Sequence, residues 1–203
     1  MNWYSVIPRD NVPGAFLDID GVDFCGCNVN RLYQGTAIED WPEDVTFSAS
    51  EHEPGERADD ALATFNLVPV FSNRLQTVVV EAGIKDFQFL PCRVVNALGV
   101  EIKGYAVANV LTIRSAFAPD HGRVLYVDPQ LNIPFVSGNI KTIVEPALFE
   151  SRLSDCDAMR IPEFCYRLFV SKRFVRAYRK IKATGFSFQP AVLINQRRSS
   201  TPR

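Results

Sequence analysis

The sequence has little of what marks exported or membrane proteins. Residues 1–10 have neither the basic start nor the apolar run of a signal peptide. No stretch approaches the roughly eighteen consecutive apolar residues that a membrane-spanning helix needs. The 203 residues are 47% hydrophobic and 22% charged, an ordinary globular composition that supports a real core. These absences predict a cytoplasmic protein without membrane contact.

Cysteine and histidine, the residues of metal and redox sites, are also scarce. The five cysteines are an odd number, and only Cys25 and Cys27 stand close together, so no disulfide framework is expected. No second cysteine or histidine pair stands at a zinc-like spacing, which favours buried, reduced thiols. The two histidines, His52 and His121, suggest no triad, and no glycine-rich phosphate loop is present. The sequence therefore predicts no metal, no cofactor and no catalytic residue.

One motif points to an enzyme. Residues 16–22 read Phe-Leu-Asp-Ile-Asp-Gly-Val and match the first motif of haloacid-dehalogenase-type phosphatases, in which Asp18 would be the nucleophile and Asp20 the acid and base. That chemistry also needs a preceding buried strand, which a proline–glycine pair shortens here, and a later acidic pair that follows a strand. The same acids with Asp23 form only a fragment of a calcium loop. We interpret this stretch as a turn stabilised by its aspartates.

The clearest predicted helix begins after Ser72, a residue type that caps helix N-termini. Its apolar residues recur at the i, i+3, i+4 and i+7 spacing that places them on one face. These residues are Leu75, Val78, Val79 and Ala82. Gly83 favours the helix end. Apolar residues 67–71 precede this helix, and Phe87 and Phe89 follow in alternation, so the unit is predicted to be strand, helix, strand.

The same arrangement returns at a constant offset of 99 residues. Residues 168–170 lead into Ser171, and a second helix follows. Its inward positions are Phe174, Ala177, Tyr178 and Ile181, with Phe186 and Phe188 in the strand after it. Five identities join 69–91 to 168–190. Either the two units arose by duplication or pack with pseudo-symmetry, or two ordinary amphipathic helices share a common pattern.

Shorter elements are expected elsewhere. Strands are predicted at 93–96, 102–113 and 123–127, a loop or edge strand at 128–137, a broken helix at 140–153 and a helix at 55–65. Together these elements predict an α+β fold in which an antiparallel or mixed sheet is flanked by the two Ser-capped amphipathic helices. The expected organisation is an irregular N-terminal portion with an acidic segment (1–64), an α+β domain (65–195) and a basic flexible tail (196–203).

Several scaffold motifs follow one another in a characteristic order. They are Pro69-Val-Phe-Ser-Asn-Arg-Leu75, Glu81-Ala-Gly83, Phe87-Gln-Phe-Leu-Pro91, Gly104-Tyr-Ala-Val-Ala-Asn-Val-Leu111, Met159-Arg160-Ile161, Phe169-Val-Ser-Lys-Arg-Phe174 and Thr184-Gly-Phe-Ser-Phe188. Their order resembles immunity family 11 of bacterial polymorphic toxin systems. The resemblance spans roughly residues 65–192. It implies an immunity-type domain that binds a cognate toxin in the bacterial cytosol and inhibits it stoichiometrically, without catalysis. Neither nucleic acid nor membrane is an expected partner.

Ionised side chains are distributed unevenly, although the net charge is only −1. Residues 39–60 contain nine acidic side chains and Arg57 as the single base, a local charge of −8. Residues 167–203 contain ten bases and no acidic side chain, a local charge of +10. Segments with charge of one sign face solvent or a partner of opposite sign, so each needs its own interpretation.

Two interpretations of the acidic segment stay open. It is either a solvated or intramolecularly paired loop, or a nucleic-acid mimic that blocks the basic substrate groove of a nuclease toxin. Trp41, set among these acids, is the type of aromatic anchor that dominates interface energies. On the second interpretation the partner-binding residues are Glu39, Asp40, Trp41, Glu43, Asp44, Glu51 and Glu53.

The basic segment contains the second predicted helix, whose charged face lies opposite its apolar stripe. Its cations are Lys172, Arg173, Arg176, Arg179, Lys180 and Lys182. Like charges three and four residues apart repel by roughly a few tenths of a kcal/mol per pair, so a negative partner would stabilise them. The candidates are the chain's own acidic segment, counterions, a toxin surface and nucleic acid. A nucleic-acid-binding module is therefore the alternative function, followed by a phosphatase that uses Asp18 and Asp20.

Overall fold

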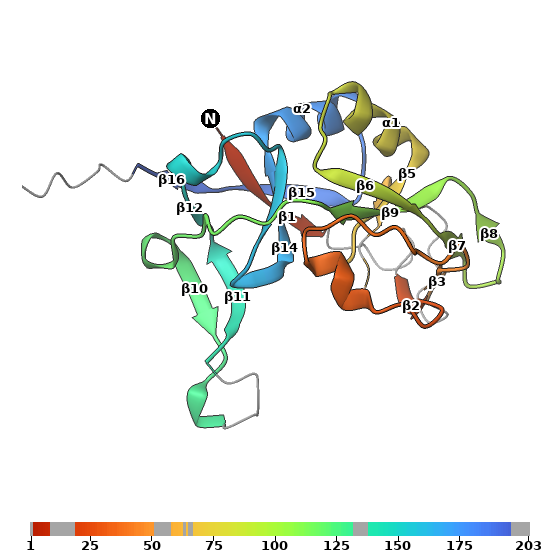
Figure 1. Ribbon diagram of the computed structural model, residues 1–203, viewed down its shortest axis with the longest axis horizontal. Helices are drawn as coiled ribbons and strands as arrows, with labels where there is room; N and C mark the ends of the chain where they lie inside the picture. The colour runs from red at the N-terminus through yellow and green to blue at the C-terminus, as the bar shows by residue number, and fades with distance from the viewer. Residues whose placement is uncertain are drawn as a thin grey trace, which may run out of the picture.

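The protein is an α+β fold built mainly of antiparallel and mixed sheets, as the sequence predicts (Figure 1). The computed structural model describes residues 2–8, 19–50, 58–62, 64, 67–131 and 138–195. Within these ranges two four-stranded antiparallel sheets form the centre. The first has the order β4 (Ala61–Leu62), β5 (Val70–Ser72), β9 (Tyr105–Val110), β6 (Phe87–Pro91). The second has the order β13 (Ala158–Ile161), β14 (Phe164–Ser171), β1 (Trp3–Pro8), β15 (Phe186–Pro190).

Smaller sheets and short helices surround this centre. A mixed sheet contains β2 (Ile19–Asp23), β3 (Thr46–Ala49), β7 (Arg93–Val95) and β8 (Glu101–Ile102). Two pairs of strands are β10 (Arg123–Tyr126) with β11 (Ile140–Glu145), and β12 (Ala147–Phe149) with β16 (Val192–Ile194). The helices are α1 (Asn73–Glu81) and α2 (Lys172–Lys180), with 3-10 turns η1 (Val29–Tyr33), η2 (Pro119–His121), η3 (Pro129–Leu131) and η4 (Glu150–Arg152). No helix in the described ranges is long and apolar enough to cross a membrane.

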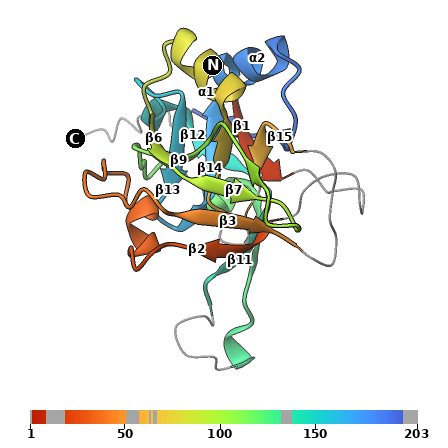
Figure 2. The same ribbon diagram turned by 90° about the vertical axis from the view of Figure 1, so that its right-hand side faces the viewer.

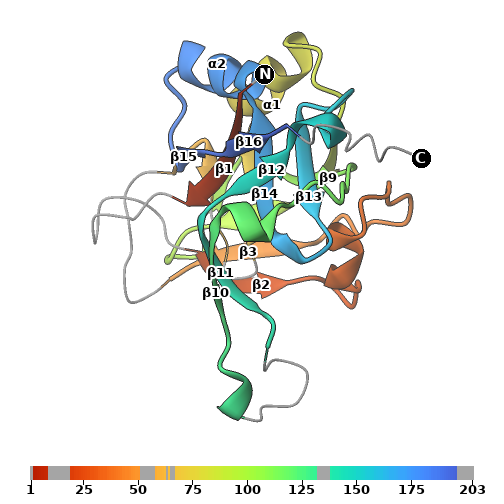
Figure 3. The ribbon, with the colours of Figure 1, turned by 90° about the vertical axis from the view of Figure 1, so that its left-hand side faces the viewer.

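The two central sheets have equivalent connections and equivalent registers. In each, a hairpin leads into a Ser-capped helix, and the strand after the helix pairs with a strand from elsewhere in the chain. Ser72 pairs with Tyr105 as Ser171 pairs with Trp3, and Pro91 pairs with Ala106 as Pro190 pairs with Tyr4. The helices α1 and α2 lie side by side at the top of the molecule (Figures 1 and 3). We call these two parts the first and second halves.

The halves exchange hydrogen bonds and share one core. The N–H of Ala61 in the first half donates to the carbonyl of Thr184 in the second (3.0 Å). In return, a carboxylate oxygen of Asp86 accepts the N–H groups of Asp157 (2.7 Å) and Ala158 (3.2 Å). One apolar cluster contains side chains of both halves, including Phe71, Phe87, Phe174 and Tyr178. The two halves are therefore joined by hydrogen bonds and by a shared hydrophobic core.

The first strand of the chain is an internal strand of the second half. β1 lies between β14 and β15 and pairs antiparallel with both. Trp3 at its start is 1% exposed. A domain boundary at residue 64 would therefore separate β1 from the sheet in which it lies.

Two predicted helices are wrong where they can be checked. In the segment predicted as helix 55–65, Ala61 and Leu62 form β4, because their backbone pairs with β5 and both side chains are buried. Residues 140–153 form β11, β12 and the η4 turn instead of a broken helix. β-branched residues dominate β11, and Pro146 lies between two strands, where it interrupts no helix.

The predicted strands at 93–96 and 123–127 are confirmed as β7 and β10, whereas the one at 102–113 is divided. Gly104, with a φ of +89°, separates β8 from β9. The tail 196–203 and residues 132–137 lie outside the described residues. β10 and β11 form an arm that projects from the body, as Figure 2 shows from a second side.

Candidate partner-binding surface

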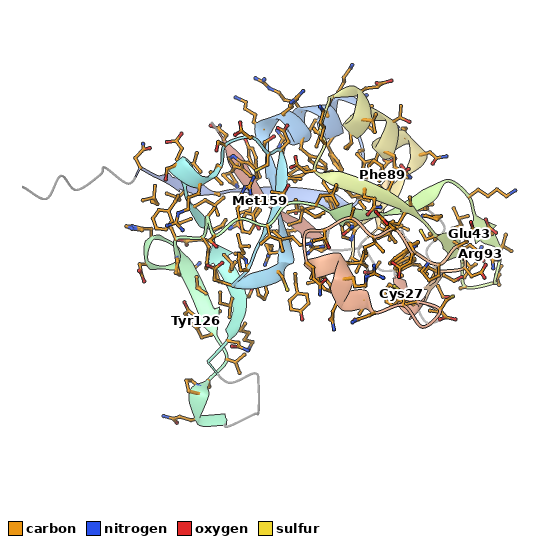
Figure 4. All side chains as sticks on the ribbon, in the orientation of Figure 1. Cys27, Glu43, Phe89, Arg93, Tyr126 and Met159 are labelled. Carbon is orange, nitrogen blue, oxygen red and sulfur yellow. The ribbon has the colours of Figure 1, made fainter. Side chains whose placement is uncertain are left out.

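The predicted acidic surface is present as an exposed loop between η1 and β3, residues 34–45. Its four acidic side chains, Glu39, Asp40, Glu43 and Asp44, are all exposed. Figure 4 places Glu43 at the end of the molecule that also holds Cys27 and Arg93. The sheet of β2, β3, β7 and β8 forms this end. We call these four carboxylates and their backbone the acidic loop.

Buried contacts at both ends hold the acidic loop in place. Ile38 is 2% exposed and Val45 is fully buried. The side-chain amide of Gln88 in β6 accepts the N–H of Ile38 (2.9 Å) and donates to its carbonyl (2.8 Å). Asn109 of β9 in turn donates to the Gln88 side chain (3.0 Å). The loop is thereby fixed to the first half, and its carboxylates are presented on a defined backbone.

Trp41 is turned toward the protein in this structure. Its indole N–H donates to the carbonyl of Pro91 (2.8 Å), and its ring lies edge-on to Phe24 at 6.4 Å. The side chain is half-buried and packs against the core cluster that contains Phe47. Trp41 therefore holds the loop against β6, and its side chain stays partly exposed.

Most of the loop's negative charge is uncompensated. Asp40 pairs with Arg31 (2.5 Å), and the hydrogen bond from Arg31 lowers the pKa of the Asp40 carboxyl. In the described part of the chain, no cationic side chain lies within ion-pair distance of Glu39, Glu43 or Asp44. With respect to the described residues, the loop therefore keeps three exposed carboxylates without a cation partner.

Cys25 lies close enough to this surface to interact electrostatically with Asp44. Desolvation, together with the carboxylates of Asp23 and Asp44, raises the pKa of the Cys25 thiol. The prediction of buried thiols is wrong for Cys25, which is exposed, and for Cys27, which is half-exposed. The turn geometry explains the exposure, because Cys25 has a φ of +51° and its N–H donates to Asp23 (2.8 Å). All five cysteines are free thiols.

The far end of the acidic segment is interior and does not join the acidic loop. Asp59 and Asp60 are 4% and 8% exposed. Asp60 accepts hydrogen bonds from Ser72 (2.8 Å) and Arg74 (2.5 and 3.0 Å), the residues that start α1. Glu51 and Glu53 lie outside the described residues, as do Asp18 and the side chain of Asp20. The structure thus brings together four of the six predicted acidic contact residues.

Asp157 has the same role in the second half as Asp60 in the first. It accepts hydrogen bonds from Ser171 (2.5 Å) and Arg173 (3.1 Å) at the start of α2. Sequence comparison of the halves could have found the two arginines, which align at the offset of 99, but not the aspartates, which are 97 residues apart. These carboxylates are structural, because each neutralises an arginine and holds a helix start.

The basic face of α2 is exposed and has few acidic neighbours. All six predicted cations are exposed, and Arg173 pairs with Asp157. Among the described residues, the other five have no acidic partner within ion-pair distance. Pairing with the chain's own acidic segment, one of the interpretations left open, is therefore absent from the described structure. α2 lies at the top of the molecule in Figure 1, away from β2 and β3.

No metal or triad geometry is found within the described ranges. No group of three or more histidine, cysteine and acidic side chains is placed to hold a metal ion there. His121 lies in η2 with its ring edge-on to Phe149 at 6.3 Å, so its contact is aromatic packing. The arrangement of the described residues supports recognition through charge.

Comparison with known proteins identifies the family. No protein with a curated description matches the sequence. Residues 28–193, however, match the Immunity protein family (Imm11). The match begins before the acidic loop and includes both helices, so it extends further toward the N-terminus than the resemblance in residues 65–192. The chain therefore belongs to the Imm11 immunity protein family.

Proposed function

We propose that this protein neutralises a cognate bacterial toxin by binding it in a stoichiometric complex in the cytoplasm. The observation that carries the proposal is the family match over residues 28–193, which includes both helices and the acidic loop. Inhibition by binding needs a preformed surface, and the exposed, fixed charges of this chain supply one. No step of the proposed inhibition requires a reactive side chain.

The test is rescue of cells from the toxin encoded by the neighbouring reading frame. Cells that express the toxic domain should survive when this protein is co-expressed, and the two chains should elute together at a 1:1 ratio. Rescue by a protein that never forms the complex would contradict inhibition by binding. If cells that express both chains do not survive, the proposal itself is overturned.

A finer proposal concerns the toxin's chemistry. The acidic loop covers the basic substrate groove of a nuclease, with its carboxylates in the place of nucleic-acid phosphates. Three carboxylates that have no cation partner among the described residues support this proposal, because complementary charge accelerates association and selects partners. The Gln88 contacts support it too, since a fixed loop loses little conformational entropy on binding.

The loop proposal is tested by replacing carboxylates of the loop with amides of nearly the same size and shape. The Glu43→Gln/Asp44→Asn variant should slow association with the toxin about tenfold at low salt. The matched control is Asp120→Asn/Glu163→Gln, which removes two exposed carboxylates elsewhere. Equal association rates for both variants would refute the loop proposal and leave toxin neutralisation standing. A competition assay with double-stranded DNA on the toxin then shows whether the covered site is the nuclease groove.

A further inference from the structure

The pseudo-symmetry of the two halves provides an internal control for the basic face of α2. α1 and α2 occupy equivalent places, so positions where they differ are not fixed by the fold. The equivalent outward positions are Asn73 and Lys172, Arg74 and Arg173, Thr77 and Arg176, Val80 and Arg179, Glu81 and Lys180, and Gly83 and Lys182. Only one of these six pairs has a cation in both helices. It is the pair Arg74 and Arg173, and each of these arginines binds the carboxylate at the start of its helix.

The remaining cations of α2 destabilise the helix in isolation. Arg176 stands three and four residues before Arg179 and Lys180, and such like-charged pairs repel. The helix dipole favours cations in the last turn, but α1 ends with Val80 and Glu81 at the equivalent positions and forms a helix of the same length. Lys182 also has a left-handed φ of +52°, where the first half has Gly83. The scaffold therefore does not require these charges.

The surface beside these cations has the composition of a protein interface. A shallow cavity of about 280 Å³ lies between the two helices. Val78, Ala82 and Ala177 contribute its apolar surface, and Arg176, Lys180 and Glu81 its charged surface. Protein interfaces combine apolar centres with arginine-rich polar rims, whereas the carboxylate of Glu81 in this lining would repel a phosphate backbone.

We propose that the outer face of α2, with Arg176, Arg179, Lys180 and Lys182, is a second docking surface that binds an acidic surface of the toxin. This inference rests on the proposed function, because the toxin is the partner named. The acidic loop and this face have opposite charge. A toxin that meets both can bind in one orientation only, so the pair of contacts selects the cognate toxin from others with similar grooves.

The experiment replaces two residues of α2 with the residues that α1 has at the equivalent positions. The Arg176→Thr/Lys180→Glu variant introduces into α2 the residues that α1 has at the equivalent positions, so the fold is expected to accept them. The control is Lys103→Glu/Lys141→Thr, which changes the net charge equally at exposed sites on other elements. Binding of the purified toxic domain from the neighbouring reading frame is measured at about 0.15 M salt, where exposed charges further apart than roughly 8 Å are screened. Thermal unfolding of each variant verifies folding.

The exchange variant should bind at least about tenfold more weakly than the control, because it removes two cations from the contact and adds one carboxylate. Equal affinity of exchange variant and control would overturn this inference while the proposed function stands. A wild-type protein that does not bind the toxic domain would overturn both. A 20-base-pair DNA duplex is the second probe, and duplex binding that the exchange variant loses would assign the face to nucleic acid and overturn the proposed partner.

Discussion

Lys182 illustrates how comparison of the halves explains a single residue. Lys182 and Gly83 end equivalent helices in the left-handed conformation, with φ of +52° and +68°. In both halves the following N–H donates back to the helix, from Ile84 to Val79 and from Ala183 to Tyr178. The geometry is thus set by the helix end, and only glycine adopts it without steric cost.

Lys182→Gly is therefore expected to stabilise the protein. The left-handed conformation costs a side chain roughly 1–2 kcal/mol, part of which is offset by the greater freedom of glycine in the unfolded chain. We expect the free energy of unfolding to rise by about 0.5–1 kcal/mol, measured by urea denaturation. Lys180→Gly, two residues earlier and inside the helix, should lower it by about 1 kcal/mol. A loss of stability in both variants would show that Lys182 makes a compensating contact.

Two features require glycine at position 185: its positive φ and the lack of room for a Cβ atom. A Cβ atom there would lie 1.9 Å from the carbonyl oxygen of Ala61, at the junction between the halves. Gly185→Ala should lower the unfolding free energy by more than about 3 kcal/mol, because backbone atoms must move. Gly26→Ala is the matched control, since Gly26 has a φ of +78° and open space around its Cβ position. Equal melting temperatures for the two variants would contradict this account.

At the scale of elements, local patterns predicted the helices and non-local pairing determined the strands. Apolar spacing and serine caps lie within nine or ten residues of sequence, so α1 and α2 could be predicted from them. β4 could not, because the N–H of Ala61 donates to the carbonyl of Thr184, which lies far along the chain in the other half. β11 was predicted as helix for the same reason, since its partner β10 lies across a long connection.

The ionisation of Asp60, which binds the residues at the start of α1, makes the stability of the protein depend on pH. Burial tends to raise the pKa of Asp60, but hydrogen bonds from Arg74, Ser72 and the N–H of Thr184 outweigh it and leave the pKa lowered. A lowered folded-state pKa stabilises the protein fully above the unfolded value of 3.8, and this stabilisation is lost as the pH falls through the folded value.

Asp60→Asn should lower the unfolding free energy at pH 7 by about 1–3 kcal/mol, because a charged, hydrogen-bonded group is lost. The difference in unfolding free energy between wild type and variant should become smaller below about pH 4, because the wild-type carboxyl becomes protonated there. Chemical denaturation at pH 7, 5 and 3 measures this, with Asp120→Asn as an exposed control. If this difference in unfolding free energy stays constant from pH 7 to pH 3, the ionised carboxylate of Asp60 does not cause the loss of stability.

At the scale of the whole molecule, sequence predicted the charged surfaces better than their surroundings. Composition alone placed Glu39, Asp40, Glu43 and Asp44 together on an exposed loop. The contacts of Gln88 and the inward turn of Trp41 depend on strands that meet only in the folded chain, so no local signal revealed them. The equivalence of the halves was one of two predicted alternatives, and the paired registers of the two sheets decide for pseudo-symmetric packing.

The two proposed docking surfaces are separate and of opposite charge, so we expect toxin binding to be sensitive to salt. Raising the salt concentration from about 0.05 to 0.5 M shortens the screening length about threefold, which weakens steering between exposed charges. We expect the association rate to fall about tenfold or more, with a much smaller change in the dissociation rate. Stopped-flow fluorescence at several salt concentrations measures both rates. An association rate independent of salt would contradict charge-directed recognition at either surface.

The place of β1 has a consequence for protein synthesis. β1 leaves the ribosome long before the strands with which it pairs, because β14 ends at residue 171 and β15 at residue 190. The first half can therefore close during translation, while the second half waits until β15 has been synthesised. A nascent chain that has not yet reached β14 leaves both edges of β1 unpaired.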